Sequence, residues 1–235
     1  MIQRVGSVVL LSLFFLGAAA PKRAPAPKKD PAPAREPQPR PALVITEILY
    51  DPISSETDDA QTEWVEIQNI GAQPARLAGL QITSGMKGKI HDAKQRFVLP
   101  AVTIAPGEYA VIGIGAAACY AEFKLPPFAA HCGEAKYAWL LNSGDSVAIR
   151  DEKSEIIDEV VFSADAPWPS AGRGASIQFV PIEGETPTTA NDDPKNWVAS
   201  NAGNSDDFPG HGRGTPGGPP RSSAATTQPI AAKKR

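Results

Sequence analysis

The sequence is poor in the side chains that many enzymes use, with two cysteines and three histidines among its 235 residues. His91, His131 and His211 are scattered without the paired spacing of metal ligands, and no serine stands in a nucleophile-elbow context. The glycine-rich run at residues 210–214 follows no expected strand and opens no expected helix, unlike a phosphate-binding loop. These shortages exclude the common enzyme signatures, so we expect a non-catalytic protein.

The chain also lacks an apolar run of the ~20 residues that a membrane-spanning helix needs. Its N-terminal apolar stretch, residues 8–16, follows Arg4 and precedes the small residues 17–20, which is the pattern of a secretory signal. No cysteine follows the stretch, which argues against a lipid anchor. We expect a signal peptide at residues 1–20, cut after Ala19, and a periplasmic, cell-surface or secreted mature protein without a transmembrane span. The alternative is that the segment is retained as an uncleaved anchor.

Both ends of the chain are too biased in composition to enter a packed core. Residues 21–41 include eight prolines, and such a segment favours polyproline II, which would extend ~65 Å at ~3.1 Å per residue. We expect this segment to be a linker, with recognition by a proline-binding partner as the alternative. Residues 221–235 hold few large apolar side chains and are expected to form a disordered basic tail. One folded domain, residues 42–220, remains between them.

Charge follows the same boundaries. Residues 1–41 carry 7 basic and 2 acidic side chains, residues 42–220 carry 12 and 24, and residues 221–235 carry 4 and none. An acidic body repels phosphate backbones, so we do not expect the folded domain to bind nucleic acid. The basic ends are interpreted as solubilising segments, with contact to anionic polymers or membranes as the alternative.

The middle of the chain alternates short apolar runs with turn residues, which is typical of an all-β domain. Such apolar runs begin near Val44, Trp64 and Leu77, and no long series of apolar residues has the 3.6-residue spacing of a helix. Eight or nine strands over about 140 residues fit a two-sheet sandwich. After residue 181, Trp197 is expected to pin a long closing loop to the body. Further strands are predicted at residues 96–99, 109–114, 137–141, 145–151, 155–162 and 175–180.

Six short phrases carry a resemblance to a known family. They are LVITEILYDP from Leu43, EWVEIQNIG from Glu63, ARLAGLQIT from Ala75, FVLP from Phe97, TIAPGEYAVIG from Thr103 and LLNSGDSVAIRD from Leu140. Together they resemble the lamin tail domain, an immunoglobulin-like β-sandwich, in the form found in exported bacterial proteins, with the best match at residues 43–151. The resemblance implies an interaction module without catalytic residues. It implies structural roles for Trp64, Gly79, Leu80, Pro106, Gly107, Asn142, Gly144 and Asp145.

The only two cysteines, Cys119 and Cys132, lie 13 residues apart, and in an exported chain we expect them to form a disulfide bond. They enclose an apolar segment that departs from the compact family pattern. Its residues Tyr120, Phe123 and Phe128 either fold back over the end of the sandwich, which we favour, or form an interaction loop. A catalytic use of Cys132 is disfavoured, because a catalytic thiol must stay free.

The loop between the first two expected strands is acidic. Its side chains Asp51, Asp58, Asp59 and Glu63 could bring oxygen ligands to a hard cation such as calcium, although their spacing matches no EF-hand loop. The alternative is a solvated acidic loop without a cofactor.

Two further glutamates, Glu47 and Glu66, lie with Glu63 in the phrases "TEI" and "EWVE". We interpret all three as edge or turn residues that hydrogen-bond backbone amides.

These observations predict an exported, non-catalytic binding or scaffolding module at the periphery of a bacterial cell. One alternative is an accessory subunit that recruits a separate nuclease or other hydrolase to an extracellular polymer. Another is a calcium-stabilised structural component of the envelope. The partner, whether a protein or an extracellular polymer, and the oligomeric state are not defined by the sequence.

Overall fold

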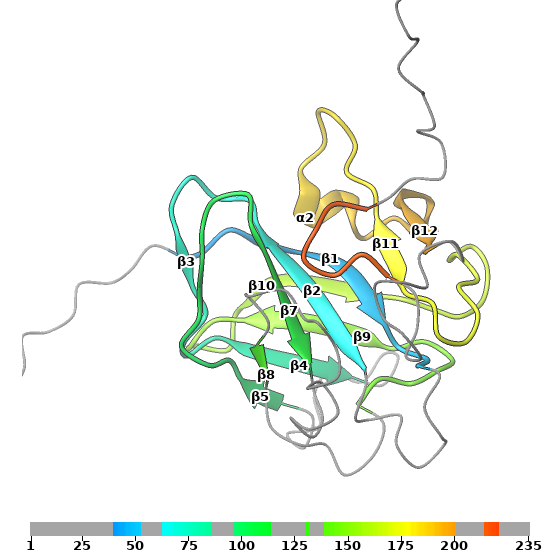
Figure 1. Ribbon diagram of the computed structural model, residues 1–235, viewed down its shortest axis with the longest axis horizontal. Helices are drawn as coiled ribbons and strands as arrows, with labels where there is room; N and C mark the ends of the chain where they lie inside the picture. The colour runs from blue at the N-terminus through cyan, green and yellow to red at the C-terminus, as the bar shows by residue number, and fades with distance from the viewer. Residues whose placement is uncertain are drawn as a thin grey trace, which may run out of the picture. The chain divides into compact units, whose positions relative to one another are not determined.

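The computed structural model describes residues 40–52, 63–85, 96–113, 130–131, 139–200 and 214–220. These residues form an all-β, immunoglobulin-like sandwich of two main layers, as the sequence predicts (Figure 1). The first layer has the strand order β12-β11-β1-β2-β7-β8, the second has the order β10-β9-β4-β5, and β3 pairs with β6 in a small third sheet. In all three sheets, the paired strands run antiparallel, except that β7 and β8 are parallel.

The elements have the following bounds: β1 Leu43–Leu49, β2 Trp64–Asn69, β3 Ala75–Arg76, β4 Gln81–Gly85, β5 Arg96–Val98, β6 Thr103–Ile104, β7 Tyr109–Gly113, β8 Ala130–His131, β9 Ser146–Arg150, β10 Ile156–Val161, β11 Ile177–Phe179, α2 Pro187–Ala190, η3 Pro194–Asn196 and β12 Trp197–Ala199. Among the described residues, no helix is long and apolar enough to cross a membrane.

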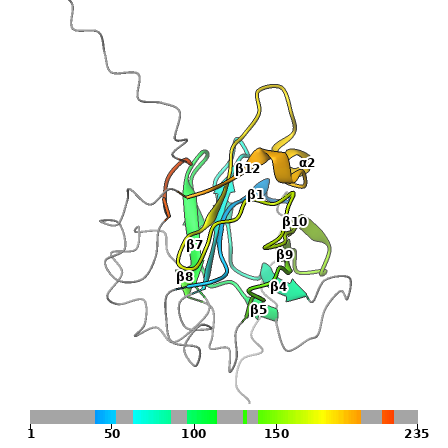
Figure 2. The ribbon, with the colours of Figure 1, turned by 90° about the vertical axis from the view of Figure 1, so that its right-hand side faces the viewer.

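The core lies between the two main layers, which Figure 2 shows side by side. Ile45 and Ile67 face it from the first layer, and Ile82 and Ile149 face it from the second. Ile67, Ile82 and Ile149 alternate along their strands with residues outside the core, so the period-two pattern of the sequence sets which face of these strands is buried. The largest fully buried side chains in this core are Trp139, Phe162 and Phe179.

Every residue of β1 is buried, although β1 has two faces. One face meets the second layer. On the other face, Leu49, Trp64 and Val111 form a separate apolar cluster. Residues 214–218, which we call the strap, lie against this outer face, on the side away from the second layer (Figure 2). The strap therefore explains why a strand with an outward-facing side is buried throughout.

Residues beyond β10 extend the first layer. β11 pairs with β1, and β12 pairs with β11. Trp197 begins β12, and its ring packs 5.9 Å from that of Phe179 and 5.6 Å from that of Trp168, measured between centroids. Its Nε1–H also donates to the carbonyl of Asn191 at 2.7 Å. The expectation that Trp197 anchors the closing segment is confirmed.

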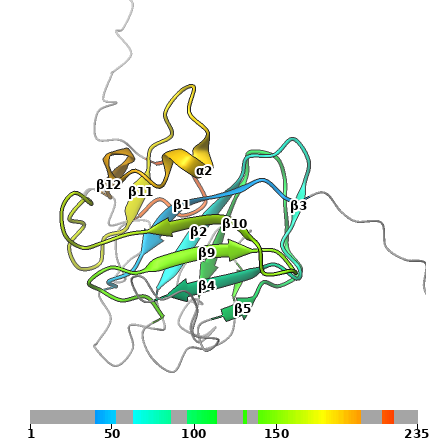
Figure 3. The ribbon, with the colours of Figure 1, turned by 180° about the vertical axis from the view of Figure 1, so that it is seen from behind.

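The predicted strand at residues 137–141 is wrong for the residues that the structure describes. Trp139 and Leu140 lie in a bend, because their N–H groups donate to Oε2 of Glu63 at 2.7 Å and 3.0 Å instead of to a neighbouring strand. β12 was not predicted, since three residues are too few to display an alternation. In the second layer (Figure 3), β5, β9 and β10 fall within the predicted strands, and β4 begins within the phrase ARLAGLQIT and extends two residues beyond it.

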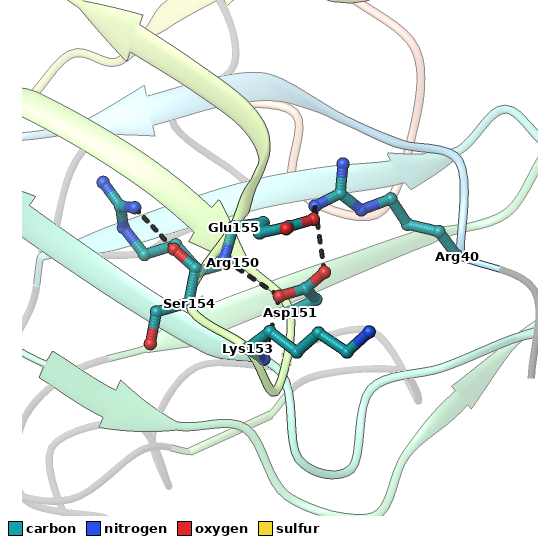
Figure 4. Close-up of polar contacts among 6 residues, drawn as sticks. All are labelled: Arg40, Arg150, Asp151, Lys153, Ser154 and Glu155. Carbon is teal, nitrogen blue, oxygen red and sulfur yellow. Dashed lines mark hydrogen bonds and ion pairs between the residues drawn. The ribbon is translucent and has the colours of Figure 1, made fainter. Parts of the chain in front are cut away.

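Arg40 contacts the turn between β9 and β10, as Figure 4 shows. Its Nη2 lies 2.9 Å from Oδ2 of Asp151 and 3.0 Å from Oε2 of Glu155. Oδ1 of Asp151 accepts the N–H groups of Lys153 and Glu155, each at 2.9 Å, and so holds the turn in which Ser154 has a φ of +68°. Because Arg40 belongs to the predicted linker, this ion pair fixes where the linker meets the sandwich.

We expect Arg40→Ala to lower the melting temperature slightly at low salt and not at about 1 M salt, where the Debye length is about 3 Å. Asp151→Ala should lower it further at both salt concentrations, because it also removes the acceptor of two turn amides. Thermal unfolding of both variants tests this. An Arg40→Ala effect that is equal at low and high salt would contradict an electrostatic role.

Candidate functional site

Two glutamates lie opposite each other in the centre of the first layer. Glu47 of β1 is the register partner of Glu66 of β2, and each residue is only 1% exposed. A β-bulge between Ile45 and Glu47 leaves Thr46 without a partner in β2. Both carboxyl groups contact the strap, which places them on the outer face.

Glu47 accepts hydrogen bonds from three other parts of the chain. The Oγ–H of Ser176 and the Nε2–H of Gln178, at 3.0 Å, donate to its Oε1. The N–H of Thr215 donates to Oε1 at 2.9 Å, and the Oγ1–H of Thr215 donates to Oε2 at 3.1 Å. One carboxyl group thus joins β1 to the segment entering β11, to β11 itself and to the strap.

Glu66 holds the next part of the strap. Its Oε1 accepts from Oγ1 of Thr46 at 2.7 Å, and its Oε2 accepts from the N–H of Gly217 at 2.5 Å. Gly214 lies so close that a Cβ atom there would be 2.7 Å from Oε1 of Glu47 and 3.0 Å from a ring carbon of Trp64. The absence of a side chain at Gly214 therefore allows the backbone of the strap to reach Glu47.

Burial raises the pKa of both carboxyl groups from their ordinary value of 4.5. The pKa of Glu66 lies well above that value, because burial acts first and the charge of Glu47 adds to it. Above pH 4.5 this pair thus binds more protons in the folded protein than in the unfolded chain. The stability that the protonated pair contributes is present in acid and is lost as the pH rises through the raised pKa values.

The hydrogen bonds of this site are structural, because they connect segments of the same chain. All four carboxyl oxygens accept hydrogen bonds from hydroxyl, amide or backbone N–H groups of the same chain. General acid or base catalysis instead requires a carboxyl group within reach of a substrate proton. The hydrogen bonds of Glu47 and Glu66 connect the strap and β11 to β1 and β2.

The calcium prediction rests on residues that are only partly described. Asp51 follows β1, and its Oδ1 accepts from Nδ2 of Asn142 at 3.2 Å and lies 4.0 Å from Nε of Arg173. Glu63 is fully buried and accepts the two bend amides described above. The other two proposed ligands, Asp58 and Asp59, lie outside the described residues. Within the described residues, no group of three or more histidine, cysteine or acidic side chains is arranged to hold a metal ion. The calcium site stays a prediction.

The predicted disulfide and interaction loop stay predictions as well. Their residues, Cys119, Cys132, Tyr120, Phe123 and Phe128, all lie outside the residues that the structure describes.

The interpretation of Glu47, Glu63 and Glu66 as hydrogen-bond acceptors for backbone amides is confirmed. Their placement at edges or turns is wrong for Glu47 and Glu66, whereas Glu63 lies outside the strands, immediately before β2. β1 and β2 are interior strands of the first layer, and all three side chains are buried. From sequence alone, the side chain of a glutamate in a strand is normally placed on the solvent-facing side, because burying a charge is costly. The strap that lowers this cost is 151 residues from Glu66 in the chain, so local sequence gave no signal of it.

Among known protein families, the chain matches the one described as Lamin Tail Domain over residues 36–164. No curated protein matches it. Both Glu47 and Glu66 fall inside the matched range, whereas β11 and the strap lie beyond it. We call the described residues beyond this match, 165–200 and 214–220, the C-terminal extension. Two buried carboxyl groups of the matched domain therefore bind the C-terminal extension.

Proposed function

Because the chain belongs to the lamin tail domain family, whose members are non-enzymatic immunoglobulin-like domains, we propose that it is a non-catalytic binding or scaffolding module. We further propose that it is exported and acts at the periphery of a bacterial cell. The observation that carries the non-catalytic proposal is the carboxyl pair at Glu47 and Glu66, because its oxygens bind this chain's own groups. The apolar stretch at residues 8–16 and the proline-rich segment at 21–41 support export and tethering.

The edges of the second layer are the surfaces best suited to contact a partner. β5 and β10 are its two edge strands, and Val98 in β5 is 64% exposed while Val161 in β10 is 50% exposed. Edge strands pair readily with an added strand, and exposed apolar side chains on them favour such contacts. Partner binding is therefore tested at these two positions.

Export is tested by fusing residues 1–41, or residues 21–41 alone, to a reporter phosphatase that is active only outside the cytoplasm. We expect activity from the longer fusion only, because residues 1–20 carry the export signal. Equal activity from both fusions would contradict the proposal.

Binding is tested with a photo-crosslinking amino acid placed at Val98 or Val161 in cells that produce the protein. Ile182, which is exposed on the C-terminal extension, is the matched control position. We expect one recurring, identifiable partner from an edge of the second layer and none from Ile182. If neither Val98 nor Val161 yields a crosslinked partner, a binding role is contradicted. If the recurring partner is a hydrolase, the accessory-subunit alternative is favoured.

A further inference from the structure

Another buried acid, Asp158 of β10, connects the two layers at the bulge in β1. β11 pairs with β1 only at Glu47 and Ile48, so it does not reach Ile45. The N–H of Ile45 donates instead to Oδ2 of Asp158 at 2.7 Å, and Nδ2 of Asn191 donates to the carbonyl of Ile45 at 3.3 Å. These two side chains take the place of a neighbouring strand.

Asp158 and Asn191 also bind each other. Nδ2 of Asn191 donates to Oδ2 of Asp158 at 2.8 Å. Asn191 immediately follows α2, which packs beside β1 (Figure 3). The contact therefore links a strand of the second layer, a strand of the first layer and the C-terminal extension.

The remaining oxygen atom of each side chain has no hydrogen-bond partner among the described residues. One atom is Oδ1 of Asp158, a residue that is 3% exposed, and the other is Oδ1 of Asn191, a residue that is 0% exposed. A buried polar atom without a partner costs about 1–3 kcal/mol, so two of them on a pair of hydrogen-bonded side chains require an explanation. Both are acceptors if Asp158 is ionised, and two acceptors cannot satisfy each other.

We propose that Asp158 is a neutral carboxylic acid in the folded protein and forms a closed acid–amide pair with Asn191. In this pair, Oδ1–H of Asp158 donates to Oδ1 of Asn191, while Nδ2 of Asn191 donates to Oδ2 of Asp158. One proton satisfies both of the unpartnered oxygens. Oδ2, as the carbonyl oxygen of the acid, accepts from Asn191 and from the N–H of Ile45 at the same time.

The electrostatic surroundings favour this proton. Burial raises the pKa of Asp158 from 3.8 to about 7, while the donors from Ile45, Asn191 and the backbone N–H of Glu159 act in the opposite direction. The charge of Asp192, which comes from the segment after α2, raises the pKa further. β1 contributes the neutral peptide group of Ile45, and the extension contributes the neutral amide of Asn191.

The pair makes the attachment of the extension sensitive to pH. The folded-state pKa lies above the ordinary value, so between about pH 4 and pH 7 the folded protein holds a proton that the unfolded chain has released. The stability contributed by the pair is complete in acid and is lost as the pH rises through this window. Above about pH 7, ionised Asp158 turns an acceptor toward the acceptor of Asn191, and the attachment weakens.

The proton is detected directly by following the ¹³C chemical shift of the Asp158 carboxyl group in the full chain against pH, with Asp158→Asn to assign the signal. We expect a titration midpoint near 7. Asp192→Asn is the control, which should lower the midpoint without abolishing the titration, because it removes a neighbouring charge and leaves the pair intact. A carboxylate signal already present at pH 5 would overturn the proposal and assign the two oxygens to a bound water or cation.

Asp158→Asn also tests the proposal through stability. The new amide keeps a donor for Oδ1 of Asn191 and an acceptor for Ile45 at every pH, so an amide–amide pair replaces the acid–amide pair. We expect the unfolding equilibrium constant of the wild type, relative to this variant, to rise by up to about tenfold per pH unit between pH 4 and pH 7. A ratio that stays constant across this range would overturn the proposal.

Discussion

Replacing Glu47 with alanine is expected to destabilise the folded protein by about 3 kcal/mol or more, because three groups that donate to it lose their acceptor inside the protein. These groups are the hydroxyl of Ser176, the side-chain amide of Gln178 and the backbone N–H of Thr215. The loss acts on β11 and on the strap together. Urea unfolding of the full chain at neutral pH measures it.

The matched control is Glu47→Gln, which preserves the size of the side chain and the acceptor oxygen. Oγ1 of Thr215 can accept from the new amide, so we expect a loss of about 1 kcal/mol or less at neutral pH. The same variant should lose less stability than the wild type when the pH is raised, because it cannot ionise. Equal destabilisation by alanine and glutamine would contradict the role given to the carboxyl oxygens.

Replacing Gly144 with alanine is expected to cost more than about 3 kcal/mol or to prevent folding. Gly144 has a φ of +117°, and a Cβ atom there would lie 2.6 Å from Cα of Ser163 and 2.7 Å from the carbonyl oxygen of Phe162. Both contacts are with backbone, which cannot rotate away as a flexible side chain can. The clash would separate the turn before β9 from the end of β10, where the N–H of Phe162 donates to the carbonyl of Asp145 at 2.9 Å.

Gly107→Ala separates the steric effect from the backbone effect. Gly107 also has a positive φ, of +80°, but a Cβ atom there would meet nothing within 4 Å. We therefore expect a cost of only about 1–2 kcal/mol, from the left-handed conformation alone. Thermal or urea unfolding of both variants provides the comparison. A Gly144→Ala loss no larger than that of Gly107→Ala would show that the turn can move aside.

Much of the fold could be predicted from local sequence, because its signals are local. The alternation around Ile82 and Ile149 indicated strands with one buried face, and both face the core. Asn142–Asp145 indicated a turn, and Gly144 occupies the positive-φ position there. In each case the residues that determine the structure are neighbours in the chain.

The buried acids could not be predicted in this way, because their partners are distant in sequence. Glu47 meets Thr215 across 168 residues, and Asp158 meets Ile45 across 113. One local signal was present for Asp158. It stands two residues before Val160 and four before Phe162, both of which face the core, so strand periodicity placed an acid among inward-facing residues. Such an acid requires a hydrogen-bonding partner, and here that partner is Asn191.

The C-terminal extension is an integral part of the folded domain, held by buried carboxyl groups of the family-matched region. Amide hydrogen exchange of the full chain, corrected for intrinsic rates, tests it most directly. We expect the amides of Thr215, Gly217 and β11 to open with the same free energy as those of β1 and β2, and to lose that protection in Glu47→Ala. Near-intrinsic exchange at Thr215 and Gly217, with β1 and β2 fully protected, would contradict the claim.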